Sequence, residues 1–302
     1  MTFWLRPAFA LRVVSRFQRL VGFDRSMALA SSALTAGIPL ALLVASVVVQ
    51  LGQEDLATRL INRYGLTGGG AEAVRSLFSF AEGPGVSLGV GGTVFLIISS
   101  LSLARAAQRL FEQTWELPPL SVRNTLNGLR WLAGLVAYAA VGGWLYATLG
   151  EARFGLLAAA CEVPLTAVFL VWGGWTLCAR RQAWRDLVPF GVVGAVASSA
   201  YSVVAAVYLP HLFSSYATRF GPVGAVFAMI AALFGVMVVL VASSALGREV
   251  HDELGRIARG NRPPDDEVRQ EWAAVVAQAQ ERWVTAREEL ARRRSRRNGR
   301  GR

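Results

Sequence analysis

Four charged side chains recur at helical spacing around residue 110, where together they could recognise an anion. Their spacing is i, i+4, i+7 and i+11, so a helix places all of them on one face: Arg105, Arg109, Glu112 and Glu116. The planar guanidinium of arginine matches phosphate or carboxylate, which makes Arg105 and Arg109, with Glu112 beside them, candidates for holding an anionic headgroup. The structural alternative is a surface ladder in which Arg109 pairs with Glu112.

Two single residues in apolar stretches each allow a functional and a structural interpretation. Glu162 is a candidate ion-coupling carboxylate, because ionisable groups at membrane depth are energetically costly and are usually functional. It also precedes Pro164, and an acid beside a helix start marked by proline interacts favourably with the helix dipole. Pro39 removes a backbone hydrogen bond and predicts a helix kink, which could form a substrate site or only shape the packing.

The composition indicates what surrounds these residues. Of the 302 residues, 54% are hydrophobic and only 17% are charged, and the mean hydropathy is +0.41. In soluble domains, about a quarter of the residues are charged. This balance, with the charges gathered in blocks, therefore indicates an integral membrane protein. All 31 basic residues are arginines, against 20 acidic residues, which leaves a net charge of +11.

The apolar stretches predict an all-α, polytopic membrane protein with six transmembrane helices. A span needs about 20 apolar residues, and the stretches between charged residues are 26–53, 83–104, 131–150, 163–179, 187–218 and 220–247. The fifth stretch is too long for one span, so Pro210 and His211 are expected to end its helix near Leu209. The fourth reaches a normal length with Cys161 and Glu162 at its mouth.

The arginines are distributed unevenly among the segments that flank these spans. Odd-numbered segments, counted from the N-terminus, carry 26 of the 31 arginines, and even-numbered segments carry 5. The positive-inside rule then places both termini in the cytoplasm. We therefore predict a multi-pass protein of the inner or cytoplasmic membrane.

Three further helical segments are expected outside the spans. Residues 1–25 alternate arginines with aromatic and aliphatic residues, which is typical of an amphipathic helix lying in the membrane interface. Residues 54–82 predict two short helices on the outer face, split at residues 68–70. In residues 255–302, apolar side chains recur at intervals of three and four, which predicts a cytoplasmic amphipathic helix before an arginine-rich tail. The membrane domain itself is expected over residues 26–254.

The sequence argues against an enzyme. The two histidines fall on opposite sides of the predicted membrane, His211 near the outer surface and His251 in the cytoplasm, and there is no HExxH, Walker or GxSxG motif. The two cysteines, Cys161 and Cys178, stand about 25 Å apart along one helix and cannot bridge each other. We therefore expect no catalytic residue, no metal site and no cofactor.

The expected partners are membrane lipids. Seven arginines in the last eleven residues suit anionic headgroups. They lack the interleaved aromatic residues of a nucleic-acid site, so no nucleic acid is expected. Small residues at fourfold spacing in the last two spans predict close helix packing, and by extension a homo-oligomer: Gly191, Ala195 and Ser199, and Gly224, Ala228 and Ala232.

Several motifs resemble those of the YihY/BrkB family of inner-membrane proteins, in the same order, over about residues 26–254. They include the stretch from Ser100 to Pro119 with Trp115, the entry to the fifth span with Trp184 and Pro189, and the entry to the sixth with Gly221, Pro222 and Gly224. The exit at residues 246–250 has arginine where the family's ending has alanine.

The resemblance implies six helices with cytoplasmic ends, and no agreed catalytic residues to carry over. Family members were once mislabelled ribonuclease BN, and others have been linked to serum resistance or to export of lipid A precursors. The resulting hypothesis is a transporter or flippase for an amphipathic, anionic, lipid-like substrate. The alternative is a non-transporting scaffold that recruits partners and anionic lipid through its cytoplasmic tail.

Overall fold

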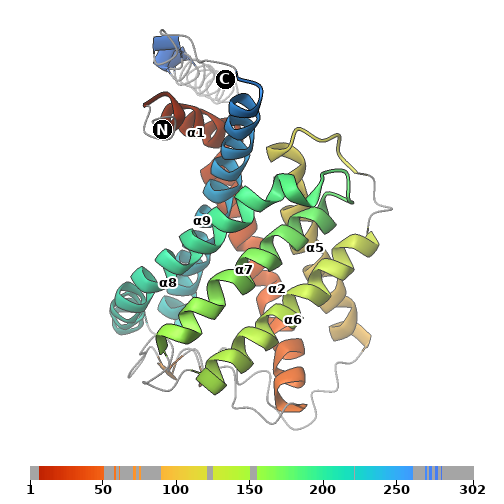
Figure 1. Cartoon of the computed structure of the whole chain (residues 1–302). Helices are drawn as coiled ribbons and strands as arrows, with labels where there is room; N and C mark the ends of the chain where they lie inside the picture. The colour runs from red at the N-terminus through yellow and green to blue at the C-terminus, as the bar shows by residue number, and fades with distance from the viewer. Residues whose placement is uncertain are drawn as a thin grey trace, which may run out of the picture. The chain divides into compact units, whose positions relative to one another are not determined.

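The computed structural model is helical throughout the residues that it describes (Figure 1). Those residues are 7–50, 90–120, 125–149, 155–220 and 222–260, with scattered positions between 58 and 75 and between 269 and 280. The helices are α1 (Pro7–Arg19), α2 (Gly22–Gln50), α5 (Val90–Thr114), α6 (Thr125–Leu149), α7 (Gly155–Leu177), α8 (Trp184–Phe220) and α9 (Pro222–Ala258). They belong to two compact units, residues 20–251 and residues 1–19 with 252–302.

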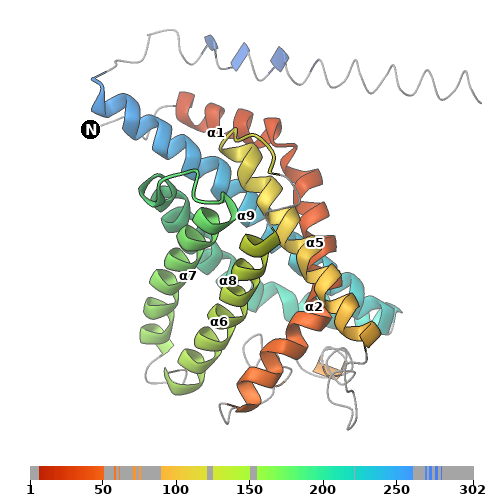
Figure 2. The same ribbon diagram turned by 90° about the vertical axis from the view of Figure 1, so that its right-hand side faces the viewer.

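The larger unit is built from helices that pack side by side. In both views α2 lies beside α5 and α6 beside α7, and contacts join each pair (Figures 1 and 2). One buried cluster brings α2, α5 and α6 together through Ala36, Leu103 and Leu132, and Met237 of α9 packs against it. Apolar burial of this kind fixes the C-terminal half of α5, which carries the arginines of interest.

Large apolar side chains stay exposed along these helices. Ile98, Val168, Val203 and Val207 are between 64% and 69% exposed, which is typical of a surface that meets lipid rather than water. Among the described residues, three helices are long and apolar enough to cross a bilayer, namely Thr125–Leu145, Trp184–Phe220 and Val226–Ala258, and Cys161–Leu177 is a shorter apolar helix. The expected all-α fold is confirmed for these residues.

The small-residue rows allow neighbouring helices to approach closely. A Cβ atom added to Gly191 would lie 2.9 Å from the Ala167 carbonyl oxygen. Gly247, which is outside the two rows, also permits a close approach, since a Cβ atom there would lie 2.3 Å from the Cα of Phe190. Ala195 and Ala228, one from each row, are completely buried. These positions therefore serve packing of α8 against α7 and α9, as the spacing predicted.

The expected end of the fifth span near Leu209 is wrong. The helix α8 runs without a break from Trp184 to Phe220 and contains Pro210. Leu209 and Phe213, before and after the proline, are buried in the same cluster as Ala228 of α9, and this packing favours a continuous helix. Proline inside an apolar helix can be tolerated where neighbouring elements support it.

Glu162 and Pro164 do not mark the start of a helix. The helix α7 begins at Gly155 and contains Pro164, so Glu162 is in its third turn. The favourable interaction with the dipole at a helix start therefore does not apply, because that effect is confined to the first turn. Glu162 is half-buried and has a partner.

Other predicted features lie wholly or partly outside the described residues. The helix α2 passes through position 39, but the side chain of Pro39 is not among those described. Most of residues 54–82 and of the cytoplasmic helix after residue 264 also lie outside them. Within the first of these segments, Ile61 and Ala71 are helical and buried against Ala205 of α8.

The smaller unit joins α1 to the last turns of α9. Arg12 NH2 lies 2.8 Å from Glu253 Oε2, and both side chains are buried. Arg16 NH2 lies 2.7 Å from Asp252 Oδ2. The helix predicted within residues 1–25 is therefore present as α1, but the side chain of Arg12 is buried in an ion pair rather than on an exposed polar face.

Candidate functional site

The helix that carries Arg105 and Arg109 ends before Glu116. The helix α5 stops at Thr114, and Glu116 has a positive φ of 52°. The amide of Leu117 donates to the Glu112 carbonyl at 2.7 Å and the amide of Glu116 to that of Gln113 at 3.3 Å. This is the geometry of a helix end closed by a left-handed residue. The expectation that Glu116 continues the charged face is therefore wrong.

Arg105 and Arg109 line a pocket of about 220 Å³ between α5, the start of α6 and the loop that joins them. We call it the arginine pocket, and its lining residues are Leu101, Ala104, Arg105, Gln108, Arg109, Glu112, Pro119, Leu120, Thr125 and Gly128. Both arginine side chains are exposed. In the part of the chain that the structure describes, neither forms a hydrogen bond or an ion pair.

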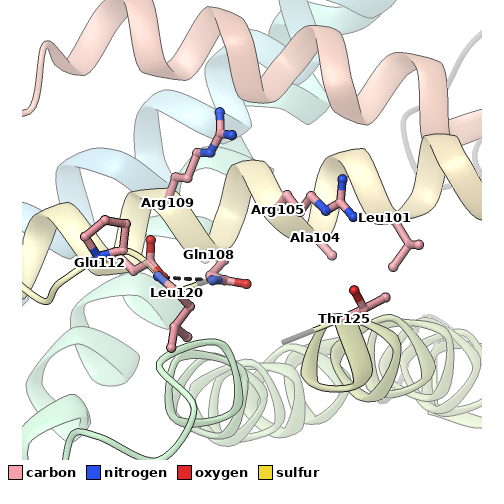
Figure 3. A pocket seen from close by; sticks show the side chains of 10 residues that line it. Leu101, Ala104, Arg105, Gln108, Arg109, Glu112, Leu120 and Thr125 are labelled. Carbon is pink, nitrogen blue, oxygen red and sulfur yellow. Dashed lines mark hydrogen bonds between the residues drawn. The ribbon is translucent and has the colours of Figure 1, made fainter. Parts of the chain in front are cut away.

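Glu112 is buried and accepts hydrogen bonds from three donors. Its Oε1 accepts from Gln108 Nε2 at 2.7 Å, from the Leu120 amide at 3.0 Å and from Arg181 NH2 at 3.4 Å. Arg109 extends from α5 away from Gln108 and Glu112 (Figure 3). Glu112 therefore anchors the loop after α5, and its charge is compensated by Arg181 rather than by Arg109.

Arg181 is the residue that sequence reasoning missed. It lies in the turn between α7 and α8, where it donates to the Pro118 carbonyl at 2.6 Å and to the Cys178 carbonyl at 3.1 Å, besides Glu112. A signal was present, because Arg180 and Arg181 follow an apolar stretch that ends in the cytoplasm by the arginine count. Its partner on α5 was not visible, since 69 residues separate them.

A third arginine adds to the positive charge near the pocket. Burial lowers the pKa of Arg25 on α2 from its ordinary value, and repulsion by Arg109 lowers it further. A guanidinium stays protonated in proteins at neutral pH, so Arg25 remains a cation that is mainly desolvated by burial and is also repelled by Arg109. An anion bound beside Arg109 would relieve this repulsion.

The arrangement can bind an anionic group of moderate size. With Glu112 compensated by Arg181, the pocket presents two exposed cations, Arg105 and Arg109, separated by one helical turn. Pockets for whole drug-sized ligands are about 300 to 1,000 Å³. A cavity of about 220 Å³ suits a headgroup, with the rest of the molecule outside it. Glu162 is not among the lining residues.

A second cluster holds the helix ends together near this pocket. Trp115 is buried, with Arg248 4.7 Å above its ring and His251 5.6 Å away in an edge contact. His251 Nδ1 lies 3.9 Å from Asp186 Oδ1 on α8. These side chains join the ends of α5, α8 and α9, and we assign them a structural role. Among the described residues, no three His, Cys, Asp or Glu residues come together as a metal site.

The other motif positions are spread over α8 and α9. Trp184 is the first residue of α8 and is 56% exposed, and Pro189 lies within the same helix. Gly224 is buried in the first turn of α9. Gly221 and the side chain of Pro222 lie outside the described residues.

The chain matches one known protein family. A family model described as "Virulence factor BrkB" matches residues 13–267, well over half of the chain. No curated protein and no solved structure matches the chain.

Proposed function

Since the chain belongs to the BrkB virulence factor family, we propose that it moves or flips an amphipathic, anionic, lipid-like substrate across the membrane. Family membership and the apolar helices support an integral membrane protein. The observation that carries the proposal is the arginine pocket, where Arg105 and Arg109 have no ion pair among the described residues. An exposed cation without a partner at the end of an apolar helix is suited to an anionic headgroup.

In the proposed topology, the chain crosses the inner or cytoplasmic membrane six times and both termini lie in the cytoplasm. We propose no catalytic activity for it. The topology predicts that a single cysteine at position 70, in a variant whose two natural cysteines are replaced by serine, is labelled by an impermeant maleimide from outside the cell. A single cysteine at position 262 serves as the control and should be labelled only after lysis. Labelling of position 70 from the cytoplasmic side alone would contradict the topology.

Substitution of the pocket arginines tests the headgroup site. Lysine keeps the charge but loses the bidentate geometry, so Arg105→Lys and Arg109→Lys should each retain less copurifying anionic lipid. Loss of one charge-assisted contact corresponds to about a tenfold weakening. Arg130→Lys is a matched control, because Arg130 is an exposed arginine at the start of α6 that bonds to Asn127 outside the pocket. Lipid would be identified by mass spectrometry of the purified protein.

Unchanged lipid retention in both lysine variants would contradict the headgroup site. The competing function is a scaffold that acts through its cytoplasmic tail. Lipid movement in reconstituted vesicles distinguishes the two, because a transporter should show it and should keep it after truncation at residue 264, which removes the tail. A scaffold should show no lipid movement with or without it.

A further inference from the structure

An apolar groove runs along α7 and α8 on the side that faces away from the helix bundle. It is separate from the arginine pocket. Its volume is about 500 Å³, and we call it the tryptophan groove. Its lining residues are Ala167, Val168, Val171, Trp172, Trp175, Trp184, Val188 and Val192. Val168 and Val192 are more than half exposed, so the groove opens outward rather than into the helix bundle.

Two arginines stand at the end of the groove where α7 turns into α8. Arg180 CZ lies 4.7 Å from the centre of the Trp175 ring, and Arg185 CZ lies 5.5 Å from that of Trp184. Both arginines are exposed, and within the described residues neither forms a hydrogen bond or an ion pair. Each guanidinium therefore lies within cation–π distance of an indole and has donors available for an anion.

From this juxtaposition we propose that the tryptophan groove is a binding site for one anionic phospholipid. An acyl chain fills the groove, and the phosphate is held by Arg180 and Arg185. From Ala167 to Trp175 the groove follows about 12 Å of helix, which is most of the roughly 15 Å thickness of one leaflet's hydrocarbon. Indoles at the polar end fit the headgroup depth that tryptophan prefers.

The charge at the mouth distinguishes this site from general contact with lipid. An apolar surface alone accepts any acyl chain equally, whereas two guanidinium groups without an ion pair among the described residues favour a lipid headgroup with a net negative charge. The turn that carries Arg180 is itself fixed, because its amide donates to the Trp175 carbonyl at 3.0 Å. The site does not rest on the proposed transport function.

Native mass spectrometry of the purified full-length chain tests the proposal with phosphatidylglycerol and phosphatidylcholine as probes at equal concentration. The protein carries Arg105→Gln and Arg109→Gln throughout, so the arginine pocket contributes nothing. We expect preferential retention of phosphatidylglycerol. Arg180→Gln with Arg185→Gln should lower it roughly 25-fold, about fivefold for each basic side chain at the membrane surface. Retention of phosphatidylcholine should barely change.

A second pair of variants tests the groove itself. Val168→Trp and Val192→Trp place a large ring where the acyl chain would lie, at exposed positions that folding tolerates, and should each reduce phosphatidylglycerol retention. Val203→Trp is the matched control, since Val203 is 69% exposed on α8 away from the groove. Equal retention of the two lipids, or full retention in both groove-filling variants, would overturn the proposal.

Discussion

Replacing Glu112 by alanine is expected to destabilise the larger unit by about 3 kcal/mol, because it removes a buried carboxylate that accepts from three donors. Its side chain is 6% exposed. The amide of Leu120 and a guanidinium nitrogen of Arg181 would both lose this acceptor. Arg181 is about a quarter exposed and keeps two backbone carbonyls, which holds the cost below that of a fully buried unpaired charge.

The glutamine variant separates the hydrogen bonds from the charge. All three donors reach the same oxygen, Oε1 of Glu112, so Glu112→Gln can keep each bond with a neutral acceptor. We expect it to cost about 1 kcal/mol, much less than alanine. Unfolding by sodium dodecyl sulfate in mixed micelles measures both variants.

A neighbouring position supplies the control for Glu112. Gln113→Ala alters an exposed side chain one residue along the same helix and should change stability by less than about 0.5 kcal/mol. In addition, Glu112→Ala combined with Arg181→Ala should cost less than the sum of the two single changes, since the pair acts together. Equal stability of Glu112→Ala and Gln113→Ala would show that the network contributes nothing.

Gly247→Ala is expected to destabilise the protein by about 3 kcal/mol, at the upper end of the range for overpacking. The added Cβ would lie 2.3 Å from the Cα and 2.7 Å from the amide nitrogen of Phe190. Those are backbone atoms of α8, so no change of rotamer relieves the clash and the two helices must separate. Thermal unfolding in detergent, followed by size-exclusion chromatography, would detect the loss.

Alanine substitutions at two other glycines serve as comparisons for Gly247→Ala. A Cβ on Gly142 meets nothing within 4 Å, so Gly142→Ala should be neutral or slightly stabilising through helix propensity. A Cβ on Gly134 would meet the ring of Trp172, a side chain that can move, so its cost should fall between the two. A melting temperature for Gly247→Ala equal to that of Gly142→Ala would mean that α8 and α9 do not pack here.

Part of the candidate site was predictable because it depends only on local spacing. Arg105 and Arg109 are four residues apart on a helix, and this alone places them on the same side of α5. Glu112 also lies among the residues that line the pocket. Its partner was not predictable, because a salt bridge between α5 and the turn after α7 depends on how the helices pack.

The prolines also show where local rules fail to predict the structure. The intrinsic cost of a proline in a helix favours an end near Leu209 and a start near Pro164, but α8 and α7 continue through both positions. Burial of Leu209 and Phe213 in one cluster supports the helix on either side of Pro210. A local penalty of about 3 kcal/mol can be offset by packing that no local rule describes.

The sequence by itself determined the class of this protein, because hydropathy and the distribution of arginines act over whole segments and do not depend on which helix meets which. It also determined the helical face of Arg105 and Arg109, through the fixed period of the helix. Only the tertiary structure decided that Glu112 pairs with Arg181 and Arg12 with Glu253, and that Arg105 and Arg109 line a pocket without an ion pair among the described residues. Those pairings join residues far apart in the chain, and the free energy that selects them comes from the burial of the helices that carry them.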